Sequence, residues 1–196
     1  MYQHDNRLAY AELKRRAIHG IENGDVLQRA NGLKRSVALH LFTKGRYPRS
    51  FQSWTVYRHN HTKARISISN SSYSVIKADW NWEVDMKRAE QTPPSDFKPE
   101  PTWIIKQAPL ENEALEAYLQ EASTIAIPVA GISGHAGKDG ADCGLKWYSN
   151  STGVSLYFWS NGPKEWDALV DWTQKLIHYL DDELWKAARR RRQNIT

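Results

Sequence analysis

The sequence predicts an α+β fold, in which an antiparallel sheet made of a meander and a C-terminal hairpin carries helices mainly on one face. Two observations lead to this prediction. Aromatic and β-branched residues alternate with polar ones through much of residues 51–87, which is typical of antiparallel strands with one solvated face. The C-terminal part combines a hairpin pattern with a long apolar stripe at helical spacing, so that a helix can cover the sheet that the hairpin joins.

The hairpin and helix pattern occupies residues 144–184. Leu145–Tyr148 and Val154–Trp159 are apolar runs, separated by a polar turn of hairpin length. A Gly-Pro pair ends the second run, because proline cannot donate to a strand ladder. The apolar positions that then recur at helical spacing are Trp166, Leu169, Val170, Thr173, Leu176, Ile177, Leu180 and Leu184. Trp172 lies off this stripe, so we expect it to face away from that core.

The rest of the chain yields shorter elements. The strongest strand pattern is Ile76–Lys87, where apolar and polar residues alternate without interruption. With the two strands before it, this segment predicts a meander joined by short polar connections. The other predicted elements are helices at Arg7–Ile21 and Leu110–Ala122 and strands at Val37–Phe42, Phe51–Arg58, Ala64–Ser69 and Trp103–Lys106.

Length and proline content predict the domain organisation. A chain of 196 residues is long enough for one domain with a proper core. Residues 89–102 contain four prolines and no apolar period, which indicates a surface linker. We therefore expect a single α+β domain over residues 1–185, crossed by this linker, and a basic tail at residues 186–196.

Charge and cysteine content indicate where the chain acts. The net charge is +5, yet residues 51–185 carry twelve Lys and Arg against eighteen Asp and Glu, so the basic residues concentrate at the two ends. The single cysteine excludes an internal disulfide framework and suits a reducing compartment. We see no secretory leader and no apolar run long enough to span a membrane, so we expect a soluble, cytoplasmic protein without membrane partners.

Three groups of residues offer chemistry, and each has a simpler interpretation. His59 and His61 would share one face of a strand and could bind a metal, but the same segment is equally consistent with a turn between two strands. Cys143 lies near His135, Asp139 and Asp142 in a glycine-rich segment, which an enzyme could use, although a lone cysteine is more often a buried filler. The glycines there lack the spacing of a phosphate-binding loop. We therefore predict no catalytic residue, no metal and no cofactor.

The aromatic residues favour a binding surface. Nine tryptophans exceed what one core face accommodates, and exposed aromatic residues are common hot spots of protein interfaces. An acidic, aromatic surface would suit a basic protein partner. The predicted partner-binding residues are Asp79, Trp80, Trp82, Glu83, Asp85, Trp159 and Trp172.

Nucleic acid is the alternative partner. A run of arginines near the C-terminus could bind phosphates, although cations at a helix C-terminus also complement the helix dipole. We note no interleaved aromatic platform beside this run. The residues of this alternative are Lys186, Arg189, Arg190, Arg191 and Arg192, together with the basic N-terminal helix.

Residues 110–184 also resemble a group of known proteins. A helix is followed by Ile127-Pro128, then by Asp139-Gly140 and an aromatic hairpin, and finally by Gly162-Pro163-Lys164-Glu165-Trp166, which opens a Leu-rich helix. This order is similar to the layout of small bacterial proteins of unassigned role. Some of these are immunity proteins encoded beside secreted toxins. The resemblance implies no catalytic residue. It implies a stoichiometric inhibitor that occludes the active site of a partner toxin. We therefore expect the chain to be a non-enzymatic binding protein of this kind. The sequence leaves its oligomeric state open.

Overall fold

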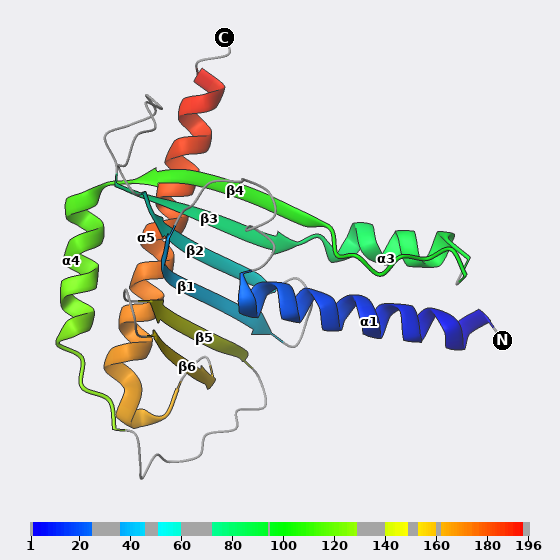
Figure 1. Ribbon diagram of the computed structural model, residues 1–196, viewed down its shortest axis with the longest axis horizontal. Helices are drawn as coiled ribbons and strands as arrows, with labels where there is room; N and C mark the ends of the chain where they lie inside the picture. The colour runs from blue at the N-terminus through cyan, green and yellow to red at the C-terminus, as the bar shows by residue number, and fades with distance from the viewer. Residues whose placement is uncertain are drawn as a thin grey trace.

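A six-stranded antiparallel sheet forms the centre of the computed structural model (Figure 1). The structure describes residues 2–24, 36–45, 51–59, 72–93, 95–128, 140–148, 153–159 and 162–193. The strand order is β4-β3-β2-β1-β5-β6, and every neighbouring pair is antiparallel. The strands are β1 (Ser36–Gly45), β2 (Gln52–Arg58), β3 (Tyr73–Trp80), β4 (Trp103–Leu110), β5 (Ala141–Tyr148) and β6 (Gly153–Trp159). The predicted α+β class, with its meander and its C-terminal hairpin, is confirmed.

The helices divide between the two faces of the sheet. They are α1 (Tyr2–Asn23), α3 (Trp82–Gln91), α4 (Asn112–Ser123) and α5 (Asp167–Gln193), the last preceded by the short 3-10 turn η2 (Lys164–Trp166). Leu39 and Leu41 of β1 belong to the main core with α5, whereas Phe42 packs in a second cluster with Leu13 of α1. Since side chains alternate along a strand, α5 and α4 cover one face, and α1 covers part of the other.

Helix α5 crosses the sheet from β6 to β4. Its buried face contains the stripe predicted from the sequence, including Leu169, Leu176 and Leu184. The expectation for Trp172 is wrong, because its side chain is only 1% exposed. The Trp172 indole N–H donates to the Tyr118 carbonyl at 3.0 Å, since α4 packs beside α5 and the helix therefore buries a face wider than one stripe.

A charge pair between a buried lysine and a half-exposed aspartate joins α5 to the sheet. The Lys77 ammonium of β3 lies 3.0 Å and 3.1 Å from the two carboxylate oxygens of Asp181 on α5. The Trp54 indole N–H donates to the same carboxylate at 2.8 Å, and the Lys77 nitrogen lies 4.6 Å from the centre of the Trp54 ring. The Lys77 side chain is 9% exposed, so these contacts replace its lost hydration.

The predicted strand at Ile76–Lys87 is wrong beyond Trp80, where β3 ends and α3 begins at Trp82. Residues 83–91 are mostly good helix formers, which the two-residue alternation concealed. Asp85, which is 0% exposed, explains why this segment is a helix and not a continuation of the strand. Its carboxylate accepts hydrogen bonds from the Trp80 indole at 2.6 Å and from the Thr102 backbone N–H and hydroxyl at 2.8 Å and 2.6 Å. A strand would not bring these donors together.

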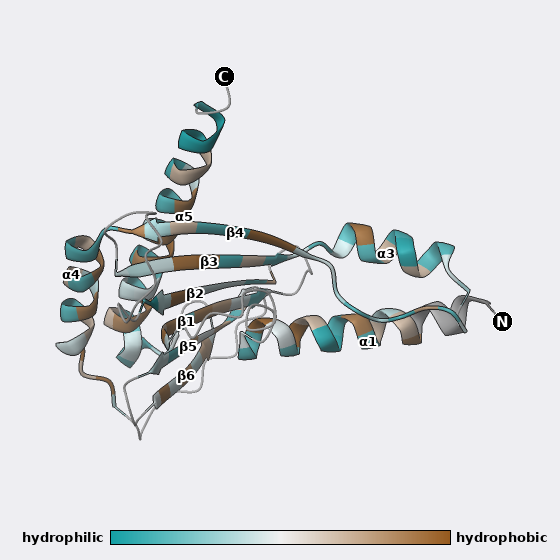
Figure 2. Ribbon diagram, turned by 45° about the horizontal axis from the view of Figure 1, so that its top comes forward, coloured by the Kyte–Doolittle hydropathy of each residue, from teal (hydrophilic) through white to brown (hydrophobic). Residues whose placement is uncertain are grey.

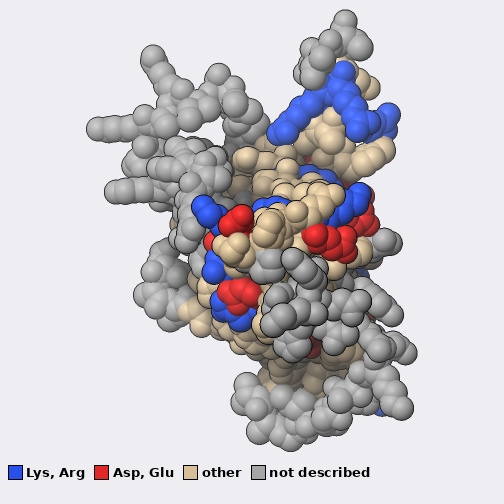
Figure 3. Space-filling view, turned by 90° about the vertical axis from the view of Figure 1, so that its right-hand side faces the viewer, with Lys and Arg blue, Asp and Glu red and all other residues tan. Residues whose placement is uncertain are grey.

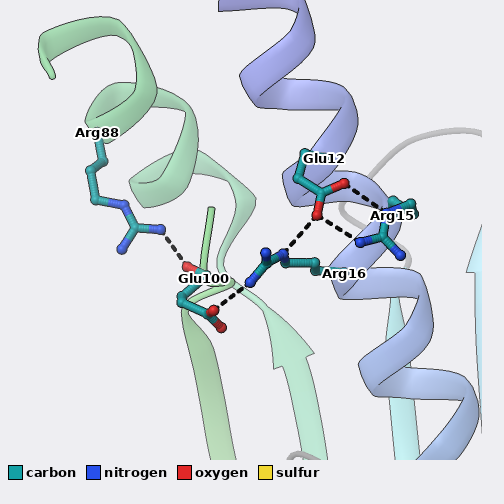
Figure 4. Close-up of polar contacts among 5 residues, drawn as sticks. All are labelled: Glu12, Arg15, Arg16, Arg88 and Glu100. Atoms are coloured by element: carbon teal, nitrogen blue, oxygen red, sulfur yellow. Dashed lines mark hydrogen bonds and ion pairs between the residues drawn. The ribbon is translucent and has the colours of Figure 1, made fainter. Parts of the chain in front are cut away.

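Helices α1 and α3 extend side by side beyond the end of the sheet and form an arm (Figure 1). Ion pairs join the arm to the segment that returns to β4 (Figure 4). Glu12 accepts from Arg15 at 2.6 Å and from Arg16 at 2.8 Å, while Arg16 also binds the Glu100 carboxylate and Arg88 binds the Glu100 carbonyl. Hydrogen bonds from Arg15 and Arg16 lower the pKa of Glu12 to about 2, so this contact persists until the pH falls towards that value.

The predicted linker at residues 89–102 is therefore more than a connection, because it begins within α3 and its Glu100 binds two helices. The predicted strand Ala64–Ser69 lies outside the described residues, and β2 pairs directly with β3.

We expect Asp85→Ala to lower the free energy of unfolding by about 3 kcal/mol, because it leaves buried donors of Trp80 and Thr102 without an acceptor. Urea denaturation measures the loss. Glu90→Ala, at an exposed position of the same helix, serves as the control and should change stability by less than about 0.5 kcal/mol. Similar losses in both variants would contradict the role assigned to Asp85.

A second stability prediction concerns Gly144, whose ideally placed Cβ would lie 2.0 Å from Cε1 of Phe42. The ring is 1% exposed and cannot move away freely. Gly144→Ala should therefore lower the free energy of unfolding by about 1–3 kcal/mol. At Gly153 the nearest atom to such a Cβ is 3.4 Å away, so Gly153→Ala should be milder in the same urea titration. Equal effects would refute this account of the close approach.

Candidate functional site

The seven residues predicted to bind a partner do not form one exposed surface. Trp80, Trp172 and Asp85 are 4%, 1% and 0% exposed, so in this structure they stabilise the interior and offer almost no surface. Each is buried by contacts that its sequence pattern did not reveal, namely the Asp85 hydrogen bonds and the packing of α4 on α5.

The other four predicted residues are spread over three elements. Trp82 is half-buried and Glu83 exposed on α3, while Asp79 of β3 and Trp159 of β6 are half-buried. The Asp79 carboxylate lies 3.5 Å from the Lys106 ammonium and 3.9 Å from that of Lys77. Strands β3 and β6 lie on opposite sides of β1 in the sheet, so these side chains do not converge on one surface.

Of the residues considered for chemistry, the structure describes His59, Asp142 and Cys143. His61, His135 and Asp139 lie outside the described residues. Burial, followed by the charge of Asp142, raises the pKa of the Cys143 thiol to about 11, which disfavours the nucleophilic thiolate. Within the described ranges, no group of three His, Cys, Asp or Glu side chains is arranged to hold a metal ion.

A histidine that the sequence reasoning passed over lies in the interior. His40 of β1 is 2% exposed, and its Nε2 donates to the Ile21 carbonyl of α1 at 2.6 Å. Its Nδ1 lies 2.8 Å from the Thr55 hydroxyl. The Lys146 ammonium also donates to a carbonyl of the same helix end, that of Glu22. These side chains satisfy the C-terminus of α1, and their role is to attach this helix to the sheet.

An acidic surface covers α4 and the first half of α5. The two helices pack against each other through the Tyr118 and Tyr179 rings, whose centres are 5.0 Å apart, and through the Lys175–Glu121 ion pair at 3.8 Å. Over residues 111–123 and 164–182, only Lys164 and Lys175 are exposed cations. The exposed carboxylates of this acidic α4–α5 surface are Glu111, Glu113, Glu116, Glu121, Glu165, Asp167, Asp171 and Asp182.

The sequence contained a partial signal for this surface. Its middle region is acidic, and α4 has no Lys or Arg. What the sequence did not reveal is that α4 lies beside α5, because the pairing depends on the Trp172 and Tyr179 contacts described above. The acidic residues therefore gather on helices rather than on the predicted strand after Ile76.

The second charged region is the C-terminal end of α5, which continues through Gln193 and extends past the edge strand β4 (Figures 1 and 3). Trp185 is 59% exposed, and the Arg189 guanidinium lies 4.6 Å from the centre of its ring. No aromatic residue interrupts the arginine run, but Trp185, one helical turn before Arg189, places one aromatic ring beside it. We call Trp185, Lys186 and Arg189–Arg192 the basic tip, and all six residues are exposed.

No described helix is long and apolar enough to cross a membrane. The hydrophilic colouring of the last turns of α5 in Figure 2 agrees with this finding.

The buried thiol gives a chemical prediction. At pH 8, a pKa near 11 in place of 9.0 reduces the thiolate fraction about a hundredfold. We therefore expect iodoacetamide to label Cys143 about a hundred times more slowly in the folded chain than in urea, as measured by mass spectrometry. Cys143→Ser should give no labelled product, because the chain has no other cysteine. Equal labelling rates in both states would contradict the raised pKa.

In comparisons with known proteins, no family model, no curated protein and no solved structure matches this chain significantly.

Proposed function

We propose that this chain is a non-enzymatic binding protein of the immunity type, which acts in the cytoplasm by covering the active site of a partner toxin with its acidic α4–α5 surface. One observation carries the proposal. Eight exposed carboxylates and only two exposed lysines lie along two packed helices, α4 and the first half of α5, and in the residues just before them.

The charge of this surface selects a basic partner. A surface whose charges are mostly of one sign speeds the encounter with a protein of opposite charge and disfavours partners of like charge. Enzymes that act on anionic substrates, such as nucleic acids, have basic active sites for the same reason. A surface of carboxylates can therefore occupy such a site in place of the substrate.

The surface is also held rigid before binding. The Trp172 indole bonds to the Tyr118 carbonyl, and the Tyr118 and Tyr179 rings stack between the helices. Helix α5 is in turn attached to the sheet by the Lys77–Asp181 pair. Since little ordering is required on association, a partner meets a preformed pattern of charge, which favours high affinity.

The test first seeks a toxin domain among the products of the genes on either side of the gene for this chain. It then compares the unaltered chain with a variant that carries Glu113→Gln, Glu116→Gln and Asp171→Gln. The loss of three carboxylates from the acidic α4–α5 surface should slow association at low salt by about tenfold or more, as measured by stopped-flow fluorescence. It should also reduce protection of cells that express the toxin.

The matched control removes three exposed carboxylates from α3 and the segment that follows it, in a variant with Glu83→Gln, Glu90→Gln and Asp96→Asn. Its net charge changes equally, but its association rate should stay within about twofold of the original. The proposal fails if both variants slow association equally, since only net charge would then matter. It also fails if no neighbouring toxin domain binds the unaltered chain with a Kd below about 1 μM.

A further inference from the structure

The basic tip has the opposite charge to the acidic α4–α5 surface, so an inference about it is independent of the function proposed above. Its cations occupy an uninterrupted helix, and the acidic α4–α5 surface ends before them. Whatever binds here must therefore be negatively charged, whereas the partner of the acidic surface is positively charged.

The arginines of the tip point in all directions around the helix. Consecutive residues of an α-helix are separated by about 100°, so Arg189–Arg192 together encircle the axis. All four are exposed, although the Arg191 guanidinium also donates to the Gln107 carbonyl of β4 at 3.2 Å. Because this part of α5 extends beyond β4 (Figure 1), a long anion can follow it on more than one side.

Trp185 adds a flat aromatic surface to these cations. It lies one helical turn before Arg189, whose guanidinium is placed over the ring. Arginine also stacks well on a nucleobase, and an exposed indole offers a base a large area for stacking. A duplex keeps its bases stacked on each other, so this combination suits unpaired bases.

We propose that the basic tip binds single-stranded nucleic acid, with phosphates contacting Lys186 and the arginines and a base stacking on Trp185. Charge complementarity defines the occupant, and the exposed indole favours nucleic acid among polyanions. A lipid surface fits less well. Over residues 186–193 the helix has no large apolar side chain, so it lacks the apolar face by which interfacial helices insert.

The probe is a fluorescein-labelled oligothymidylate of about 15 nucleotides, which is within the range of single-strand binding sites. Fluorescence anisotropy should show binding at low salt, with a slope of log K against log salt near −3 for about four phosphate contacts. A variant with Arg189→Gln, Arg190→Gln and Arg192→Gln should bind at least about tenfold more weakly and with a flatter slope.

Trp185 is tested separately. Trp185→Ala should weaken binding about tenfold with little change in the salt slope, whereas Trp185→Phe should retain most of the affinity, because it keeps an aromatic face. The control for charge carries Lys98→Gln, Lys164→Gln and Lys175→Gln, all at exposed positions away from the tip, and should bind like the unaltered chain. Thermal melting confirms that each variant folds.

Three results would overturn the proposal: no oligonucleotide binding at low salt, equal loss in the arginine and lysine variants, or equal competition by polyglutamate, which would indicate an acidic protein partner. Tighter binding to vesicles of phosphatidylserine and phosphatidylcholine than to the oligonucleotide would assign the tip to membranes instead. The variants of Glu113, Glu116 and Asp171 should not weaken oligonucleotide binding, so failure of this proposal and failure of the proposed function are distinguishable.

Discussion

The position of α5 depends on the Asp181 carboxylate, which accepts from both Lys77 and Trp54 beneath the helix. Apolar contacts alone would allow α5 to slide along the sheet, whereas the Lys77–Asp181 pair is satisfied in one register only. Removing the Asp181 carboxylate would leave the Lys77 ammonium, whose side chain is only 9% exposed, without its nearest acceptor. The acidic α4–α5 surface and the basic tip both belong to this helix. The placement of both surfaces on the domain therefore depends on this polar contact together with the apolar face of α5.

The charges to which we assign partners also stabilise α5. Carboxylates at the N-terminal part of a helix and cations at its C-terminal part both complement the helix dipole. Asp167 lies in the first turn of α5, and Arg190, Arg191 and Arg192 lie in the last. Dipole complementarity explains the sign at each end but not the amount of charge, since one or two residues at each end would suffice. Additional carboxylates on α4 and the exposed Trp185 are not required by the helix, and they are the features that point to partners.

The sequence predicted those elements whose pattern is set by local rules. The hairpin around Gly153 and the stripe from Leu169 to Leu184 needed only strand and helix periodicity, and both are present. The segment after Trp80 was missed because a two-residue alternation there coincides with helix-forming residues, and a buried Asp85 decides between them. The candidate surfaces were harder to predict from the sequence, because the exposure of Trp172 and Trp185 depends on how α4 and β4 lie relative to α5. Such distances arise from packing and have no signal within a short sequence window.

The spacing of the two surfaces determines whether they can influence each other. From Asp171 to Arg190 the helix advances about 28 Å, at about 1.5 Å per residue. The Debye length at physiological ionic strength is about 8 Å, so the charges on the two surfaces are screened from each other by more than three such lengths. A continuous helix also gives neither surface a hinge through which to move the other. A basic protein on the acidic α4–α5 surface and a polyanion on the basic tip would thus bind with nearly additive free energies at physiological salt, and any coupling between them would have to come from direct contact between the two partners.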